Sequence, residues 1–223
     1  MSYLENPRGH VVFDCDGTLI SSIDSIYEGL SELMTIILER PVSLEEAKQK
    51  YAADLVTVAH NFELAPENDP DLQMKLIQTW REVAAKQRNQ FRLFSGIEAL
   101  IEELLNKNYQ LYVWTARDRQ STLRILKDLG VAKHFLEFRC LDDCEPKPSA
   151  VGLEQMVGEY EKSKIVMIGD SYPDIYGAQS FGCASIAACW AHDDLEQYLA
   201  KYDPTALAKT PQDCVKLIEN LIG

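Results

Sequence analysis

Residues 11–19 read VVFDCDGTL and join an apolar run to two acids and a glycine. The apolar run predicts a buried strand, and the Asp-Gly pair predicts a turn directly after it. Ligands bind at the carboxyl ends of the strands in an open α/β sheet, which is where Asp14 and Asp16 would lie. Side chains two residues apart on a strand share a face, so both carboxylates are expected to point to the same side. One acid could then attack a substrate while the other moves protons.

The composition is that of an ordinary globular chain of 223 residues, 46% of them hydrophobic. This length allows one large domain or a domain with a smaller insertion. The formal net charge of −13 argues against nucleic acid or an anionic membrane as a partner, because both need a basic surface. No apolar run could span a bilayer and the first residues do not resemble a signal peptide, so we expect a cytoplasmic protein with its six cysteines reduced. The sequence does not indicate an oligomeric state.

Five short runs rich in apolar or β-branched residues predict strands, at residues 10–14, 111–115, 138–141, 164–169 and 184–188. Helical patterns separate the last four of these runs. Residues 97–105 precede the second strand, and residues 121–129, closed by Gly130, follow it. Strands that alternate with helices in this way predict an α/β fold with a doubly wound, parallel, Rossmann-like sheet.

Roughly seventy residues between the first two strands break this alternation and show helical periodicity without a convincing strand. They predict a small helical cap domain at residues 21–93, inserted into a core formed by residues 1–20 and 94–223. Three helices are expected, at residues 22–39, 43–60 and 69–90, and Ser43-Leu44-Glu45-Glu46 predicts a capping box at the second. These helices could simply pack on the sheet, but an insertion directly after the first strand is well placed to act as a lid.

Three later segments carry polar groups at strand ends or in a loop. Thr115 and Ala116 end the second strand with a hydroxyl and backbone N–H groups, which suit phosphate oxygens. Lys147 lies between two prolines, which restrict its backbone. Asp170 and Asp174 follow the fourth strand, and a helical turn there could bring both carboxylates toward a hard cation.

Each of these residues also has an ordinary structural explanation. Thr115 could cap a helix, Lys147 could be a solvated loop charge, and the two later acids could be favoured at a helix start. The Asp-Gly pair could be only a turn. A nucleophile, a hydroxyl, an ammonium group and metal carboxylates on one sheet together favour a catalytic site. A zinc site among the cysteines is not expected, because no Cys-x-x-Cys pair is present.

With these motifs in this order, the chain resembles the haloacid dehalogenase superfamily across its whole core, and the inserted helices resemble the helical C1 cap of that superfamily. Its pattern is similar to that of the phosphoglycolate phosphatase-like members. The resemblance implies that Asp14 is the nucleophile and Asp16 the general acid/base. It further implies phosphate binding by Thr115, Ala116 and Lys147, and a Mg²⁺ site formed by Asp14, the Asp16 carbonyl, Asp170 and Asp174.

The acid at position 16 selects within the superfamily, because members that cleave carbon–halogen bonds lack it and phosphonate-cleaving relatives carry a small residue there. The resemblance therefore implies a Mg²⁺-dependent phosphatase that acts on a small phosphate monoester, with a phosphoglycolate-like metabolite favoured. A phosphomutase that uses the same chemistry on a sugar phosphate is the alternative. A non-catalytic binding protein is disfavoured, since it would not need the two paired acids, Lys147 and Asp170 together.

Overall fold

The computed structural model describes residues 4–21, 23–52, 55–86 and 91–223 of the chain. The chain divides into two compact units, one formed by Met1–Ser21 with Arg92–Gly223 and the other by Ser22–Phe91. Each unit has a hydrophobic core of its own. No helix in the described ranges is long and apolar enough to cross a membrane.

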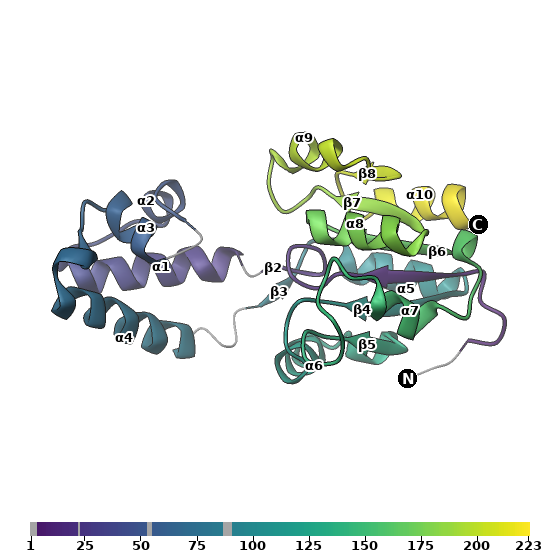
Figure 1. Ribbon diagram of the computed structural model, residues 1–223, viewed down its shortest axis with the longest axis horizontal. Coiled ribbons are helices and arrows are strands. Elements are labelled where there is room, and N and C mark those ends of the chain that lie inside the picture. Colours follow the sequence, from purple (N-terminus) through teal and green to yellow (C-terminus); the bar gives the residue numbers. More distant parts are fainter. Residues whose placement is uncertain (1–3, 22, 53–54, 87–90) are drawn as a thin grey trace. The chain divides into compact units, whose positions relative to one another are not determined.

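Six parallel strands form the sheet of the larger unit, in the order β5-β4-β1-β6-β7-β8 (Figure 1). Their bounds are β1 Gly9–Phe13, β4 Tyr109–Trp114, β5 Glu137–Arg139, β6 Ile165–Gly169, β7 Ala184–Ala188 and β8 Ala206–Ala208. Val12 of the central strand β1 is in register with Tyr112 on one side and Met167 on the other. The predicted α/β parallel sheet is confirmed, and β8 is an edge strand that the sequence did not predict.

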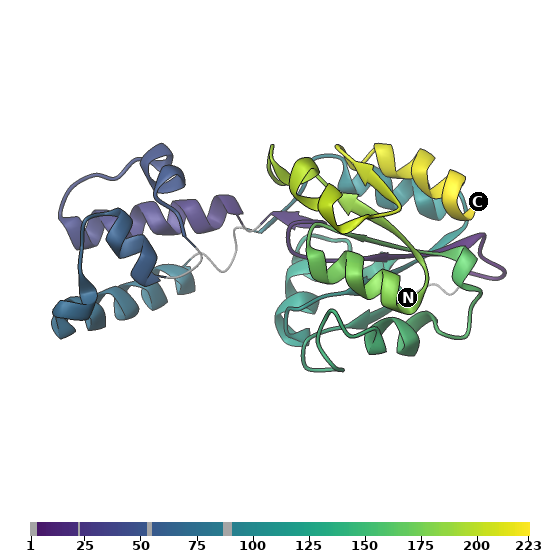
Figure 2. The same cartoon turned by 45° about the horizontal axis from the view of Figure 1, so that its top comes forward.

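Helices cover both faces of this sheet (Figure 2). Helices α5 (Ile97–Asn106) and α10 (Asp213–Ile222) pack together on one face, whereas α7 (Val151–Val157) and α8 (Tyr172–Phe181) pack together on the other. The unit also contains α6 (Arg119–Asp128), α9 (Leu195–Leu199) and short 3₁₀ helices at Ala132–His134, Lys162–Lys164 and Ala200–Tyr202. The helices predicted on either side of the second strand are confirmed as α5 and α6.

Trp114 shows how closely the helices approach one face of the sheet. Its indole is only 1% exposed and lies in an apolar cluster with residues of β1, β6, α7 and α8. A Cβ atom on Gly152 of α7 would lie 2.2 Å from the indole nitrogen, and one on Gly177 of α8 would lie 2.6 Å from the ring. Both helices can rest on the indole because these positions carry no side chain. This packing fixes the end of β4, directly before Thr115.

A short antiparallel pair marks the point where the chain leaves and re-enters the larger unit. β2 (Ile20–Ser21) pairs with β3 (Arg92–Leu93), with Ser21 opposite Arg92. The two ends of the insertion are therefore adjacent. The boundaries expected from the sequence, 20/21 and 93/94, fall at this strand pair.

The inserted unit is helical, with α1 (Ile23–Leu38), α2 (Leu44–Gln49), α3 (Leu55–Asn61), a 3₁₀ helix at Pro66–Asn68 and α4 (Pro70–Lys86). The Ser43 side chain caps α2 by accepting a hydrogen bond from the N–H of Glu46 at 3.1 Å. The prediction of a single helix at residues 43–60 is wrong, because α2 ends at Gln49 and α3 begins at Leu55. The side-chain amide of Asn61 donates a hydrogen bond to the Lys50 carbonyl across this break. Parts of the three predicted helices, at residues 22, 53–54 and 87–90, lie outside the described residues.

Candidate active site

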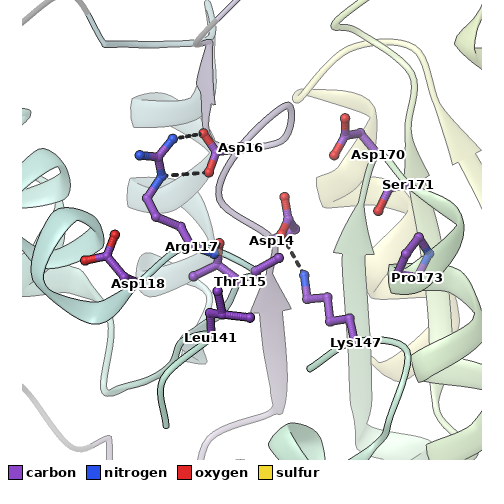
Figure 3. Close-up of a pocket in the computed structure, with 11 residues that line it drawn as sticks. Asp14, Asp16, Thr115, Arg117, Asp118, Leu141, Lys147, Asp170, Ser171 and Pro173 are labelled. Atoms are coloured by element: carbon purple, nitrogen blue, oxygen red, sulfur yellow. Dashed lines mark hydrogen bonds and ion pairs between the residues drawn. The ribbon is translucent and has the colours of Figure 1, made fainter. Parts of the chain in front are cut away.

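Three adjacent strands end at one cavity of about 530 Å³ in the larger unit (Figure 3). Asp14 follows β1, Thr115 follows β4 and Asp170 follows β6, and all three residues line the cavity. Asp14 is anchored to the neighbouring strand, because its N–H donates to the carbonyl of Ile168 at 2.8 Å. The parallel order of the sheet thus brings Asp14 together with residues that lie more than a hundred positions later in the sequence.

The turn after β1 brings its loop close to Asp170. The carbonyl of Cys15 accepts hydrogen bonds from the N–H groups of Leu19 and Ile20, both at 2.9 Å. Gly17 has a φ of +83°, and a Cβ atom there would lie 2.0 Å from Asp170 Oδ2. A residue with a side chain would be strained at this φ and would displace the carboxylate. The glycine of the Asp-Gly pair therefore both forms the turn and admits Asp170.

Lys147 lies between two buried carboxylates. Its Nζ is 2.6 Å from Asp14 Oδ1 and 2.5 Å from Asp174 Oδ1, and its side chain is only 4% exposed. Burial alone would lower the pKa of Lys147, but attraction and hydrogen bonds to the two carboxylates outweigh it and raise the pKa above its usual value. Burial raises the pKa of Asp14 well above its usual range; Lys147 opposes this rise, while the negative charges of Asp174 and Asp170 add to it. A cation added near these acids would favour their charged forms.

Asp16 lines the same cavity and pairs with Arg117. The guanidinium donates from Nε to Asp16 Oδ2 at 2.8 Å and from Nη2 to Asp16 Oδ1 at 2.5 Å, as Figure 3 shows. Hydrogen bonding to Asp16 raises the pKa of Arg117 above its usual value. Both oxygens of Asp16 are therefore engaged by one side chain.

The segment after β4 forms a tight turn at the cavity wall. The Thr115 N–H donates to the carbonyl of Arg139 at 2.9 Å, and the Arg117 N–H donates to Thr115 Oγ1 at 3.2 Å. Thr115 is 3% exposed, and Ala116 lines the cavity between these two residues. Two of the three successive N–H groups are thus already hydrogen-bonded within the protein.

Asp14, Asp170 and Asp174 have carboxylate oxygens within 4.8 Å of one another. Hard oxygen donors of this kind suit Mg²⁺ or a similar cation. Burial and the charge of Asp174 raise the pKa of Asp170 to about 7, a sign of crowded negative charge that a cation would relieve. The oxygens of Asp174 already accept hydrogen bonds from Lys147 and from the Ser171 hydroxyl, the latter at 2.5 Å. The Asp16 carboxylate is not part of this cluster, and the role of its carbonyl as a metal ligand stays a prediction.

Comparison with known proteins assigns the family. The sequence pattern of the haloacid dehalogenase-like hydrolases matches residues 11–188. The chain belongs to this family. Phosphoglycolate phosphatase of Vibrio parahaemolyticus is 23% identical over 93% of this chain and 95% of its own length. Pyrophosphatase PpaX of Halalkalibacterium halodurans is 22% identical over the same shares. A candidate phosphatase from Clostridium difficile has the same fold, with a TM-score of 0.77 at 19% identity, over 96% of this chain and 100% of its own.

The hydrolase fold gathers every site residue expected from the sequence. The cavity is lined by Asp14, Asp16, Thr115, Ala116, Lys147 and Asp170, whereas Asp174 is not in the lining and contacts Lys147. Arg117 is a site residue that the sequence did not predict, although an arginine two residues after the threonine at a strand end is a usable signal. The cysteines and histidines do not contribute to the metal-ligand cluster found among the described residues.

Proposed function

We propose that this hydrolase is a Mg²⁺-dependent phosphatase that hydrolyses a small phosphate monoester through an aspartyl-phosphate on Asp14. The contact of Lys147 with Asp14 at 2.6 Å carries the proposal, because it joins a carboxylate nucleophile to a cation that can hold the phosphate it attacks. The relatives named phosphoglycolate phosphatase and pyrophosphatase support a compact phosphate substrate.

In the proposed reaction an oxygen of Asp14 attacks the phosphorus, and the bond between phosphorus and the leaving oxygen breaks. Asp16 gives a proton to that oxygen, which departs as an alcohol. Asp16 then takes a proton from water as the water attacks the phosphorus, so that phosphate leaves and the Asp14 carboxylate is restored. Lys147, the Thr115 hydroxyl and the Ala116 N–H are the proposed ligands of the phosphate oxygens.

The acidic cluster fits the cation that this reaction requires. Asp14, Asp170 and the Asp16 carbonyl would hold Mg²⁺, and Asp174 would contribute directly or through Lys147. When bound, the ion would neutralise the charge of the carboxylates that surround an anionic substrate.

Turnover of an aryl phosphate and of a panel of phosphate esters, with and without Mg²⁺, tests this function. Wild-type protein should release phosphate, and Asp14→Asn should abolish release because it removes the attacking charge with almost no change of shape. Asp128→Asn, on the exposed surface of α6, is the matched control and should keep full activity. Release of phosphate by Asp14→Asn at the wild-type rate would refute the proposal.

A phosphomutase remains the alternative enzyme, because it would use the same residues and return the phosphoryl group to a sugar. Product analysis with a sugar phosphate separates the two, since a mutase would yield an isomeric sugar phosphate and a phosphatase free phosphate. A non-catalytic binding protein would release no phosphate from any ester.

We further propose that the inserted unit acts as a closing cap that restricts the enzyme to small substrates. Its separate core and the adjacent ends of the insertion support this role. Because Ser21 and Arg92 are direct partners, a short Asn-Gly turn can replace residues 22–91 without separating β2 from β3. The ratio of activity on a small ester to activity on a phosphopeptide should fall after this replacement, and an unchanged ratio would refute the role.

A further inference from the structure

Arg117 is the more exposed of the two cationic side chains among the described residues that line the cavity. The described residues that line the cavity include the carboxylates of Asp14, Asp16, Asp118 and Asp170, opposed by Lys147 and Arg117. Lys147 is 4% exposed and is held by two carboxylates, whereas the Arg117 side chain is 23% exposed. Of the two cations, Arg117 is therefore the one that is more accessible to an anionic group beside the phosphate site.

Arg117 holds Asp16 by two parallel hydrogen bonds, which we call the fork. The fork conflicts with the proposed role of Asp16 as the proton donor. Both oxygens of Asp16 accept hydrogen bonds from the guanidinium, at 2.8 and 2.5 Å. A group that passes a proton to the leaving oxygen must turn one of its oxygens toward that atom. The fork must therefore open at Asp16 during turnover, and the two N–H groups that it used can then donate to an anionic group of the substrate.

We propose that Arg117 determines specificity by binding a second anionic group on the leaving side of the substrate, which releases Asp16 for proton transfer. A guanidinium fork matches a carboxylate or a phosphate in the same two-point geometry that it uses for Asp16. The second anion must lie close to the leaving oxygen, because Arg117 and the proton donor are direct neighbours. The substrate class is thus a compact phosphate compound with a carboxylate or a second phosphate beside the scissile bond. This inference rests on the proposed phosphatase function.

Two matched pairs of probes separate the sources of that anion. In the first pair, 2-phosphoglycolate is compared with 2-hydroxyethyl phosphate, which replaces the carboxylate by a neutral alcohol. In the second, pyrophosphate is compared with methyl phosphate. The measured quantity is the ratio of kcat/KM for the anionic probe to that for its neutral partner. A charged hydrogen bond of ordinary strength predicts that Arg117→Met lowers this ratio about 10- to 100-fold in at least one pair. The affected pair identifies a carboxylate or a phosphate as the second anion.

Arg119→Met is the control, because Arg119 forms the same fork with Asp143, at 2.7 Å for both contacts, and does not line the cavity. This control should leave both ratios unchanged. Arg117→Lys keeps the positive charge but cannot form the two-point hydrogen bond. Its ratio of kcat/KM for the anionic probe to that for the neutral probe should lie between those of Arg117→Met and the wild type. This variant carries the test if thermal unfolding shows that Arg117→Met is poorly folded.

A binding measurement separates recognition from turnover. In Asp14→Asn protein, which should not turn over, calorimetry should give a lower dissociation constant for 2-phosphoglycolate than for 2-hydroxyethyl phosphate, and adding Arg117→Met should remove the difference. If wild-type protein releases phosphate but neither the rates nor the binding depend on Arg117, the specificity role is refuted and the phosphatase function stands. If wild-type protein hydrolyses no phosphate compound, both fail.

Discussion

Replacing Lys147 with methionine should destabilise the protein strongly. Methionine nearly preserves the volume of the side chain but removes the cation between Asp14 and Asp174. The side chains of these acids are 9% and 1% exposed, so water can replace the ammonium group only poorly. The variant also loses the contact of Nζ with the Trp114 ring, whose centre is 4.9 Å away.

The expected loss is about 3–5 kcal/mol at pH 8, the cost of leaving a buried charge without its partner. This loss of unfolding free energy should be smaller at pH 5, because the pKa of Asp14 is raised in the folded protein. Asp14 has a raised pKa in the folded protein, so its protonated form is stabilising at low pH and that stabilisation is lost as the pH rises. Removing Lys147 takes away the positive charge that opposes this rise, so the pKa of Asp14 rises further in the folded variant. The loss of unfolding free energy in the variant should therefore grow with pH.

Urea unfolding followed by circular dichroism, in the presence of a chelator, measures this deficit at both pH values. Adding Asp174→Asn to the variant should recover part of the lost stability, because one of the two unpaired charges disappears. Lys107→Met breaks a more exposed ion pair, with Glu219, and should have a far smaller effect. A loss below about 1 kcal/mol for Lys147→Met at pH 8 would refute the view that Lys147 is the counter-ion of a buried acidic pair.

Three further predictions concern the chemistry and the pH dependence. Asp16→Asn should lose most activity on alkyl phosphates, whose leaving groups need a proton, and less on aryl phosphates; equal losses in the two assays would argue against Asp16 as the acid. Activity should disappear with a chelator, return with Mg²⁺ and be inhibited by Ca²⁺. Asp170→Ala should raise the Mg²⁺ requirement or eliminate turnover. Full activity after exhaustive chelation would exclude the metal site. Burial lowers the pKa of His10 from 6.5 to about 4, so the stability gained from its neutral form is complete above pH 6.5 and lost as the pH falls to 4. His10→Gln should reduce the change in unfolding free energy between pH 6.5 and pH 4, measured with urea, by about 3 kcal/mol. An unaltered change would contradict this role of His10.

The parallel sheet could be predicted because its central strands are buried on both faces and appear in the sequence as continuous apolar runs. β8 could not, since Ala206–Ala208 is a three-residue edge strand without β-branched residues. The pair of β2 and β3 was equally hidden, because each strand has two residues and finds its partner across the whole insertion. The hydrogen bond from the Asn61 side chain to the Lys50 carbonyl, which spans the break between α2 and α3, is likewise a contact that no local pattern reveals.

The sequence identified the acids of the site because each follows an apolar strand and so must lie at one edge of the sheet. It did not predict which charges pair. Lys147 reaches Asp14 across 133 positions and Arg117 reaches Asp16 across 101, and loop conformation decides both contacts. The role of Asp174 as a metal ligand stays a prediction. The structure adds that the Asp174 carboxylate contacts Lys147.

Trapping the phosphorylated enzyme tests the role of Asp14 most directly. Wild-type protein is mixed with a phosphate ester and Mg²⁺, quenched in acid during turnover, and reduced with borohydride, which converts an aspartyl-phosphate to homoserine. Peptide mass spectrometry should find homoserine at position 14, and none in Asp14→Asn protein treated identically. Homoserine at another aspartate, or its absence while phosphate is being released, would contradict Asp14 as the nucleophile.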